Sequence, residues 1–60
     1  MAIDYKMLRD ATGLDQERFA MEVGVPVEVV KAWESGSAQP DAMTQKRIFA
    51  VVKKYAEQGQ

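Results

Sequence analysis

Glycine and proline interrupt this chain at four points and leave only short segments between them. Within each segment the apolar residues recur every three to four positions, which is typical of helices. The valine-rich stretch around Pro26 is short and contains a proline, which disfavours the interior of a strand. The breaks fall at Thr12-Gly13, Gly24-Val25-Pro26, Ser35-Gly36 and Gln39-Pro40. We therefore expect an all-α fold, with one small four-helix domain over residues 1–60.

Residues that favour helix ends flank these segments. Asp4, Asp15 and Asp41 precede the first, second and fourth segments, where an aspartate side chain can cap free backbone N–H groups. Pro26 suits the first position of the third helix, because its missing N–H would have no partner within the helix. We expect helices over about residues 4–12, 16–23, 27–34 and 41–57, with the third beginning at Pro26 or Val27.

The apolar residues of each segment predict one face of its helix. A small residue, Ala20, and then Gly24 follow Gln16 at intervals of four, which lets two helices cross steeply at a tight turn. In the first segment the residues that share a face are Ile3, Met7, Leu8 and Ala11. The inward residues expected in the second and third segments are Phe19, Ala20, Val23, Val30 and Trp33. Trp33 would have to be exposed to stack on a nucleic-acid base, and its helical position favours the core instead.

The composition narrows the kinds of site that this chain can build. Its 60 residues include no cysteine and no histidine, which excludes disulfides and thiolate zinc sites. The net charge is −1, although a nucleic-acid-binding surface is usually basic. Residues 1–41 hold eight acids and four bases, whereas residues 42–60 hold four bases and one acid. The basic charge is therefore concentrated near the C-terminal end.

A set of residues between Leu8 and Pro40 forms a more specific pattern. Its most distinctive part combines two motifs. The first is Gln-x-x-x-Ala-x-x-x-Gly, which begins at Gln16. The second is Trp-Glu-x-Gly, which begins at Trp33 and is followed by Pro40. The other members are Leu8-Arg9, Gly13-Leu14, Gln16-Glu17, Phe19-Ala20, Gly24-Val25 and Val30. This pattern resembles the phage-repressor, Cro and Xre-like family of transcriptional regulators. The resemblance implies a lambda-repressor-like domain whose helix-turn-helix unit covers about residues 16–35.

The resemblance also implies how the chain would meet double-stranded DNA. The third helix would enter the major groove, where side chains can contact base edges. The base-contacting positions are Val27, Glu28, Lys31 and Ala32. The positions expected to contact phosphate are Gln16, Arg18, Ser37 and Gln39. Arg9 and Glu34 would form an internal ion pair that ties the first helix to the third.

Several of these positions differ from the polar or basic residues common in the family. Pro26 stands where a serine or threonine usually caps the third helix, and the loop after Gly36 is not basic. Glu28 has two interpretations: an acid that favours the helix dipole, or an acceptor for a cytosine amino group. Lys31 would reach guanine or phosphate, or else only be solvated. The basic residues of the fourth helix either form a solvated face or contact the DNA backbone: Lys46, Arg47, Lys53 and Lys54.

The fourth helix carries a broader apolar surface than one core-facing stripe requires. Such a surface on a short terminal helix needs a second cover. We expect a homodimer interface there, and the alternative is a helix wrapped by the rest of the domain. The expected interface residues are Ile48, Phe49, Val51, Val52 and Tyr55.

These observations favour a small bacterial or phage transcriptional regulator, a repressor that acts on duplex DNA as a homodimer. The alternative is a protein-interaction module or antitoxin-like accessory subunit that keeps the fold but binds DNA weakly or only with a partner. We expect no enzyme activity, no cofactor, no metal and no small-molecule substrate, because nothing pairs a catalytic acid with a base. Charged residues interrupt any leader-like start and the apolar runs are short, so we expect a cytoplasmic location and no membrane.

Overall fold

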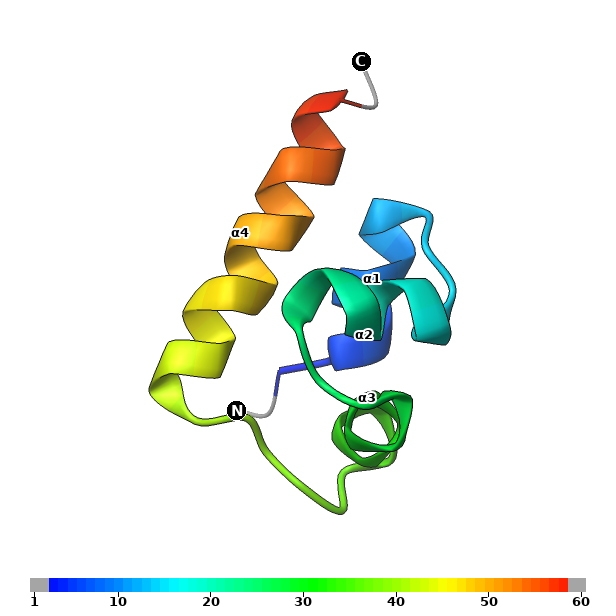
Figure 1. The fold of residues 1–60 in the computed structure, drawn as a ribbon, viewed down its shortest axis with the longest axis vertical. Helices are drawn as coiled ribbons and strands as arrows, with labels where there is room; N and C mark the ends of the chain where they lie inside the picture. The colour runs from blue at the N-terminus through cyan, green and yellow to red at the C-terminus, as the bar shows by residue number, and fades with distance from the viewer. Residues whose placement is uncertain (1–2, 59–60) are drawn as a thin grey trace.

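The computed structural model describes residues 3–58, which form four α-helices and no strand (Figure 1). The helices are α1 (Tyr5–Thr12), α2 (Gln16–Val23), α3 (Val27–Ser35) and α4 (Ala42–Gln58). The first three helices form a group beside the long α4. Within this group α2 packs mainly against α3, while α1 and α2 both contact α4. The predicted all-α, four-helix architecture is confirmed.

Aspartate side chains cap three of the helices, as their positions in the sequence predict. In each case one carboxylate oxygen accepts a hydrogen bond from the backbone N–H three residues later, where no intrahelical acceptor is available. The donor–acceptor pairs are Met7 to Asp4 at 3.1 Å, Arg18 to Asp15 at 2.8 Å and Thr44 to Asp41 at 2.8 Å. The starts of α1, α2 and α4 are therefore specified locally.

The sequence leaves the first residue of the third helix open between Pro26 and Val27, and in the structure that residue is Val27. The φ of Pro26, −64°, suits a helix, but its ψ of 150° is extended, so Pro26 is the N-cap and α3 begins at Val27. The proline ring restricts φ and leaves ψ free, so Pro26 can stand just outside the helix. The side chain of Pro26 makes no capping hydrogen bond, and its carbonyl accepts from the N–H of Val29 at 3.0 Å.

The turn between α2 and α3 depends on Gly24. Its φ is 91°, in the left-handed region that side-chain-bearing residues rarely adopt, and its N–H donates to the Ala20 carbonyl at 2.8 Å. A Cβ at Gly24 would lie 3.6 Å from an Arg47 nitrogen, an ordinary contact. Backbone conformation, and not lack of space, therefore requires a glycine at this turn.

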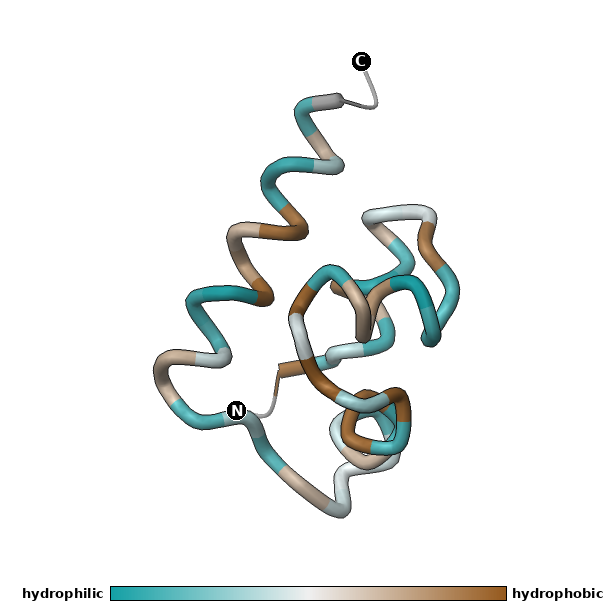
Figure 2. Tube along the Cα trace, viewed as in Figure 1, coloured by the Kyte–Doolittle hydropathy of each residue, from teal (hydrophilic) through white to brown (hydrophobic). Residues whose placement is uncertain are grey.

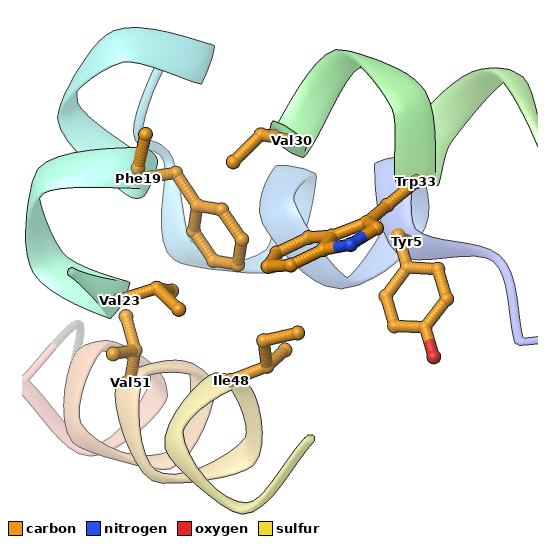
Figure 3. Close-up of a cluster of buried hydrophobic side chains, with 8 residues drawn as sticks. Tyr5, Phe19, Val23, Val30, Trp33, Ile48 and Val51 are labelled. Carbon is orange, nitrogen blue, oxygen red and sulfur yellow. The ribbon is translucent and has the colours of Figure 1, made fainter. Parts of the chain in front are cut away.

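A single hydrophobic core joins all four helices (Figure 3). Figure 2 shows that the hydrophobic segments of α4 lie on the side that faces the other helices. The inward residues predicted for α2 and α3 are all buried, which confirms that part of the sequence analysis. The buried residues are Tyr5, Phe19, Ala20, Val23, Val30, Trp33, Ile48 and Val51.

The prediction that the apolar residues of α1 form its inward face is wrong. Ile3 and Met7 are 39% and 67% exposed, Ala11 is exposed, and Leu8 is only half-buried. Tyr5 turns inward instead, with its ring centroid 6.0 Å from that of Trp33. A count of apolar residues misses this rotation, because the inward side of α1 includes a tyrosine with a polar tip.

The excess of apolar surface expected on α4 is smaller than the sequence indicates. Ile48 and Val51 lie in the core of one chain, so the prediction that they face a partner is wrong. Val52 and Tyr55 are half-buried against the core, and Phe49 is 45% exposed. The reason is that α4 packs against both α1 and α2, and two neighbours cover a wider stripe than one neighbour does.

Candidate nucleic-acid interface

The outer face of α3 is the first element of the candidate site. Glu28 and Lys31 are exposed there, Ala32 is half-buried, and the three residues stand at the i, i+3, i+4 spacing of one helix face. Among residues 3–58, neither Glu28 nor Lys31 forms an ion pair. Val27 is half-buried and packs against the edge of the core. The charged groups of this face are therefore free to meet another molecule.

The opposite face of α3 is rigidly supported. Val30 and Trp33 are only 1% and 5% exposed and pack among side chains from the other helices (Figure 3). Close packing of this kind holds the backbone in one position, so the outer side chains project from a fixed support. The helix ends at Ser35, and the N–H of the following cap residue, Gly36, donates to the carbonyl of Trp33 at 3.3 Å.

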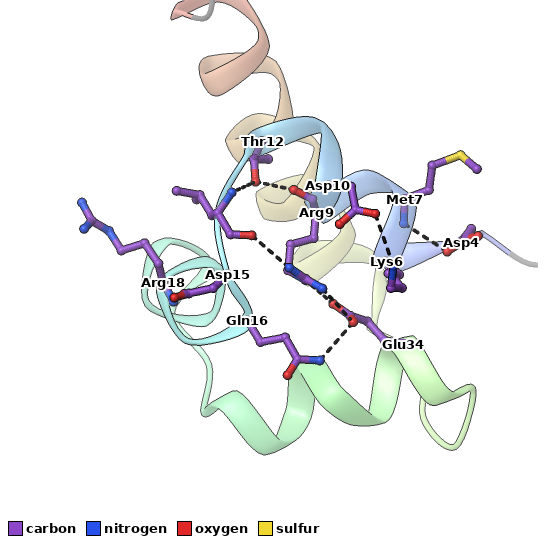
Figure 4. Close-up of polar contacts among 11 residues, drawn as sticks. Asp4, Lys6, Met7, Arg9, Asp10, Thr12, Asp15, Gln16, Arg18 and Glu34 are labelled. Carbon is purple, nitrogen blue, oxygen red and sulfur yellow. Dashed lines mark hydrogen bonds and ion pairs between the residues drawn. The ribbon is translucent and has the colours of Figure 1, made fainter.

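A polar network of Arg9, Gln16 and Glu34 connects α1, α2 and α3 (Figure 4). The Arg9 guanidinium donates to the Glu34 carboxylate through Nε at 2.6 Å and through a terminal nitrogen at 3.3 Å. Its other terminal nitrogen donates to the carbonyl oxygen of Leu14 at 3.0 Å. Gln16 Nε2 donates to Glu34 Oε1 at 3.0 Å. The network thus joins the start of α2 to the last turns of α3.

The pKa values of Arg9 and Glu34 are shifted in the directions that keep both side chains charged. Burial alone would raise the pKa of Glu34, but the hydrogen bonds from Arg9 and Gln16 outweigh burial and leave that pKa below its ordinary value. The hydrogen bond to Glu34 raises the pKa of Arg9. The side chains are 14% and 9% exposed, so the pair is screened less by salt than a surface pair is.

Arg18, one of the expected phosphate contacts, lies on the exposed side of α2 beside an acid. Its Nε is 3.6 Å from Glu22 Oε2, and Lys54 Nζ of α4 is 3.9 Å from the other carboxylate oxygen. Glu22 therefore partly neutralises two cations at once. Exposed pairs of this kind are weak, so both cations can leave Glu22 for a stronger anionic partner.

The remaining expected phosphate contacts lie in the loop between α3 and α4. Ser37 and Gln39 are both exposed. The N–H of Ser37 donates to the carbonyl of Ala32 at 3.0 Å and its hydroxyl lies 3.0 Å from that of Ser35, so Ser37 helps to close the end of α3. The loop offers polar groups to a ligand but no positive charge.

A comparison with protein-family models decides the family. The helix-turn-helix model matches residues 6–57, which is most of the chain. The chain belongs to the Xre-like helix-turn-helix family. No curated protein and no solved structure matched it. The family consists of DNA-binding regulators and is not an enzyme family, and this domain is accordingly a DNA-binding regulator of the Xre type.

In residues 3–58, no three metal-ligating side chains cluster together. None of the four helices combines the length and the apolar character that spanning a membrane requires.

The sequence analysis missed two contacts that shape the site. The hydrogen bond between Gln16 and Glu34 joins residues 18 positions apart, so no local spacing reveals it. The Arg18–Glu22 pair, in contrast, has the i, i+4 spacing of a helical ion pair and is readable from the sequence alone.

Proposed function

We propose that this domain is a sequence-specific repressor of a bacterium or phage, which binds duplex DNA with α3 in the major groove. The observation that carries the proposal is the outer face of α3, where Glu28 and Lys31 are exposed on a rigidly packed helix and form no ion pair within residues 3–58. Lys31 has the length to donate to guanine, and Glu28 can accept from a cytosine amino group. A repressor of this kind acts by occupying its operator, so that polymerase is blocked.

Phosphate contacts on both sides of α3 would fix its orientation in the groove. Gln16 and the N–H groups at the start of α2 supply donors on one side, and Ser37 and Gln39 supply polar groups on the other. These groups are uncharged, and Arg18 is the one cation among the proposed phosphate contacts. We therefore expect an affinity that depends on salt less steeply than that of a strongly basic DNA-binding domain.

A fluorescence-anisotropy titration against duplex DNA from the protein's own promoter tests this proposal. Each neutralised phosphate contributes about −0.9 to the slope of log K against log salt, so Arg18, together with Lys31 and any basic residues of α4 that reach the DNA backbone, predicts roughly −2 to −4 per chain. Lys31→Ala should reduce the slope by about 0.9 if Lys31 meets a phosphate. Lys53→Ala is the matched control, because it removes the same charge from the end of α4 that lies away from α3 (Figure 1).

The same titration separates the repressor from its rival. Residues 1–41 carry a net charge of −4, which suits a protein-docking module or an antitoxin-like accessory subunit better than a DNA-binding surface. If the folded protein shifts no duplex at low ionic strength, the proposal that the domain alone represses with α3 in the major groove is wrong. The outer face of α3 would then be a protein contact, and Val27 or Glu28 substitutions should release the partner.

Glu28→Gln should change which base is preferred at one position of each half-site. Glutamine pairs well with adenine, whereas a carboxylate accepts from cytosine, and loss of the negative charge also reduces repulsion of phosphate. We expect tighter binding to unrelated sequences together with the altered preference, measured by competition among duplexes that differ at single positions. Glu57→Gln, the same change near the end of α4, should do neither. An unaltered preference in Glu28→Gln would place this residue outside the groove.

We further propose that two chains form a homodimer through the remaining apolar surface of α4, centred on Phe49. Phe49, near the middle of α4, is a large apolar residue that is 45% exposed, and Met43 in the first turn of the same helix is 71% exposed. A two-fold dimer would present two α3 helices about 34 Å apart, one turn of DNA. Sedimentation equilibrium should show a dimer that Phe49→Ser weakens and that Met21→Ser, at an apolar site of α2 with 75% exposure, does not weaken. A parent protein that stays monomeric at high concentration excludes this dimer.

A further inference from the structure

The side-chain amide of Gln16 is held in one orientation by a charged acceptor. Its Nε2 donates to Glu34 Oε1 at 3.0 Å, and an ionised carboxylate can only accept. The nitrogen end of the amide therefore faces Glu34, and the oxygen end points away from it (Figure 4). One of the two N–H groups on Nε2 donates to Glu34, and the other has no hydrogen-bond acceptor within residues 3–58.

Glu34 is in turn fixed from two sides. Arg9 holds both of its carboxylate oxygens, at 2.6 Å and 3.3 Å, and the same guanidinium holds the carbonyl of Leu14, two residues before Gln16. The chain leading into α2 and the side chain of Gln16 are thus positioned by one partly buried ion pair. Because Arg9 balances the charge of Glu34, the carboxylate can anchor Gln16 without presenting a net negative charge to an approaching phosphate.

We propose that Glu34 is a positioning residue for phosphate binding: it holds the Gln16 amide so that its free N–H, beside the first backbone N–H groups of α2, donates to one phosphate of the DNA backbone. This inference rests on the proposed function. Its physical basis is that ordering a long side chain on binding opposes association, so a glutamine ordered in advance binds more tightly. Glu34 touches no DNA and acts only through Gln16.

A cycle of four proteins tests the coupling between Glu34 and Gln16. They are the parent, Gln16→Ala, the double substitution Arg9→Met with Glu34→Met, and all three substitutions together. Methionines of similar length replace the ion pair without altering net charge, and apolar replacement of a buried pair often preserves stability. Each protein is titrated with the same duplex at a temperature at which circular dichroism shows it to be folded.

The expected pattern is a loss that depends on Gln16. Gln16→Ala should weaken binding about 3–10-fold for all duplexes alike, since a phosphate contact reads no sequence. Replacing the ion pair should weaken binding by a similar factor when Gln16 is present and by less than about 2-fold when it is absent, because only the ordered side chain is lost. An equal loss in both backgrounds means that the pair supports the fold alone, and it overturns the proposal.

A second measurement on the free protein separates this inference from DNA binding itself. In a ¹⁵N–¹H spectrum the two side-chain amide protons of Gln16 should be shifted apart by the carboxylate, unlike those of exposed Gln39. Replacing the ion pair should remove the difference, and Glu34→Gln, which keeps an acceptor for Arg9, serves if the double variant does not fold. Gln16 protons that resemble those of Gln39 in the parent overturn the inference. A shifted Gln16 without any duplex binding overturns the proposed function and the phosphate role, and leaves the contact as a tie between α2 and α3.

Discussion

Phe19→Ala is expected to bring this domain close to complete unfolding. Phe19 is 1% exposed at the centre of the core, among side chains from α3 and α4 (Figure 3). Removing a buried phenylalanine ring costs about 3–5 kcal/mol, from lost burial and from the cavity that remains. At the usual 0.05–0.15 kcal/mol per residue, a domain of this size has only about 3–9 kcal/mol of total stability.

Urea unfolding followed by circular dichroism and by Trp33 fluorescence measures this loss. Met21→Ala is the matched control, since Met21 lies two residues away in α2 and is 75% exposed. Surface substitutions of this kind change stability by about 0.5 kcal/mol or less. A Phe19→Ala protein as stable as Met21→Ala would mean that the core does not pack around α2 in this way.

The helix-turn-helix unit was the most predictable part of the fold, for physical reasons that act over short distances. Asp15 caps α2 with its own side chain, and Gly24 supplies the left-handed residue that the turn requires. Phe19 and Val23 lie on one helix face because of their spacing, so their burial follows once the unit forms. Each of these features depends on neighbours within a few positions in the sequence.

The faces of α1 and α4 were less predictable because distant parts of the chain determine them. Tyr5 turns inward to meet Trp33, and its hydroxyl accepts a hydrogen bond from Gln45 Nε2 at 3.3 Å, 40 positions along the chain. Val51 is buried because α2 lies beside α4, which no pattern within α4 reveals. Tertiary packing therefore overrides local amphipathicity where a helix has two neighbours.

The candidate site also has one part that the sequence predicts and one part that depends on tertiary packing. The exposure of Glu28 and Lys31 follows from their position opposite Val30, so the outer face of α3 is readable from helical periodicity. The contact between Gln16 and Glu34 depends on the crossing of α2 and α3, and periodicity carries no information about it. What the sequence analysis did not provide is the connection among the site residues.

Arg9→Ala should destabilise the domain by roughly 1–3 kcal/mol, because it leaves the Glu34 carboxylate largely buried without its charged partner. It also removes the hydrogen bond to the Leu14 carbonyl, at the entry to α2. Lys6→Ala is the control, since Lys6 pairs with Asp10 at 3.5 Å on the surface with both side chains more than half exposed. An exposed i, i+4 pair contributes about 0.3–0.5 kcal/mol. Equal losses of stability in the two variants would show that the Arg9–Glu34 pair contributes no more than an exposed ion pair.

The difference in stability between the parent and Arg9→Ala should depend on pH through Glu34. In the parent the pKa of Glu34 is lowered, so its contribution is complete above the unfolded-state pKa of about 4.3 and is lost as the pH falls through the lower folded-state pKa. Without Arg9, burial acts with less opposition and raises that pKa. Protonation of Glu34 therefore stabilises the variant, whereas it destabilises the parent. Urea unfolding of both proteins between about pH 3 and pH 7 should therefore show the largest difference in stability near neutrality and a smaller one below about pH 4.

The pKa of Asp41 is also lowered, by its hydrogen bonds with Thr44, but this carboxyl is fully exposed and unchanged in the variant, so its contribution cancels in the difference. A difference that stays constant across this range would mean that Arg9 stabilises the domain through packing and the Leu14 carbonyl, and not through the charge of Glu34.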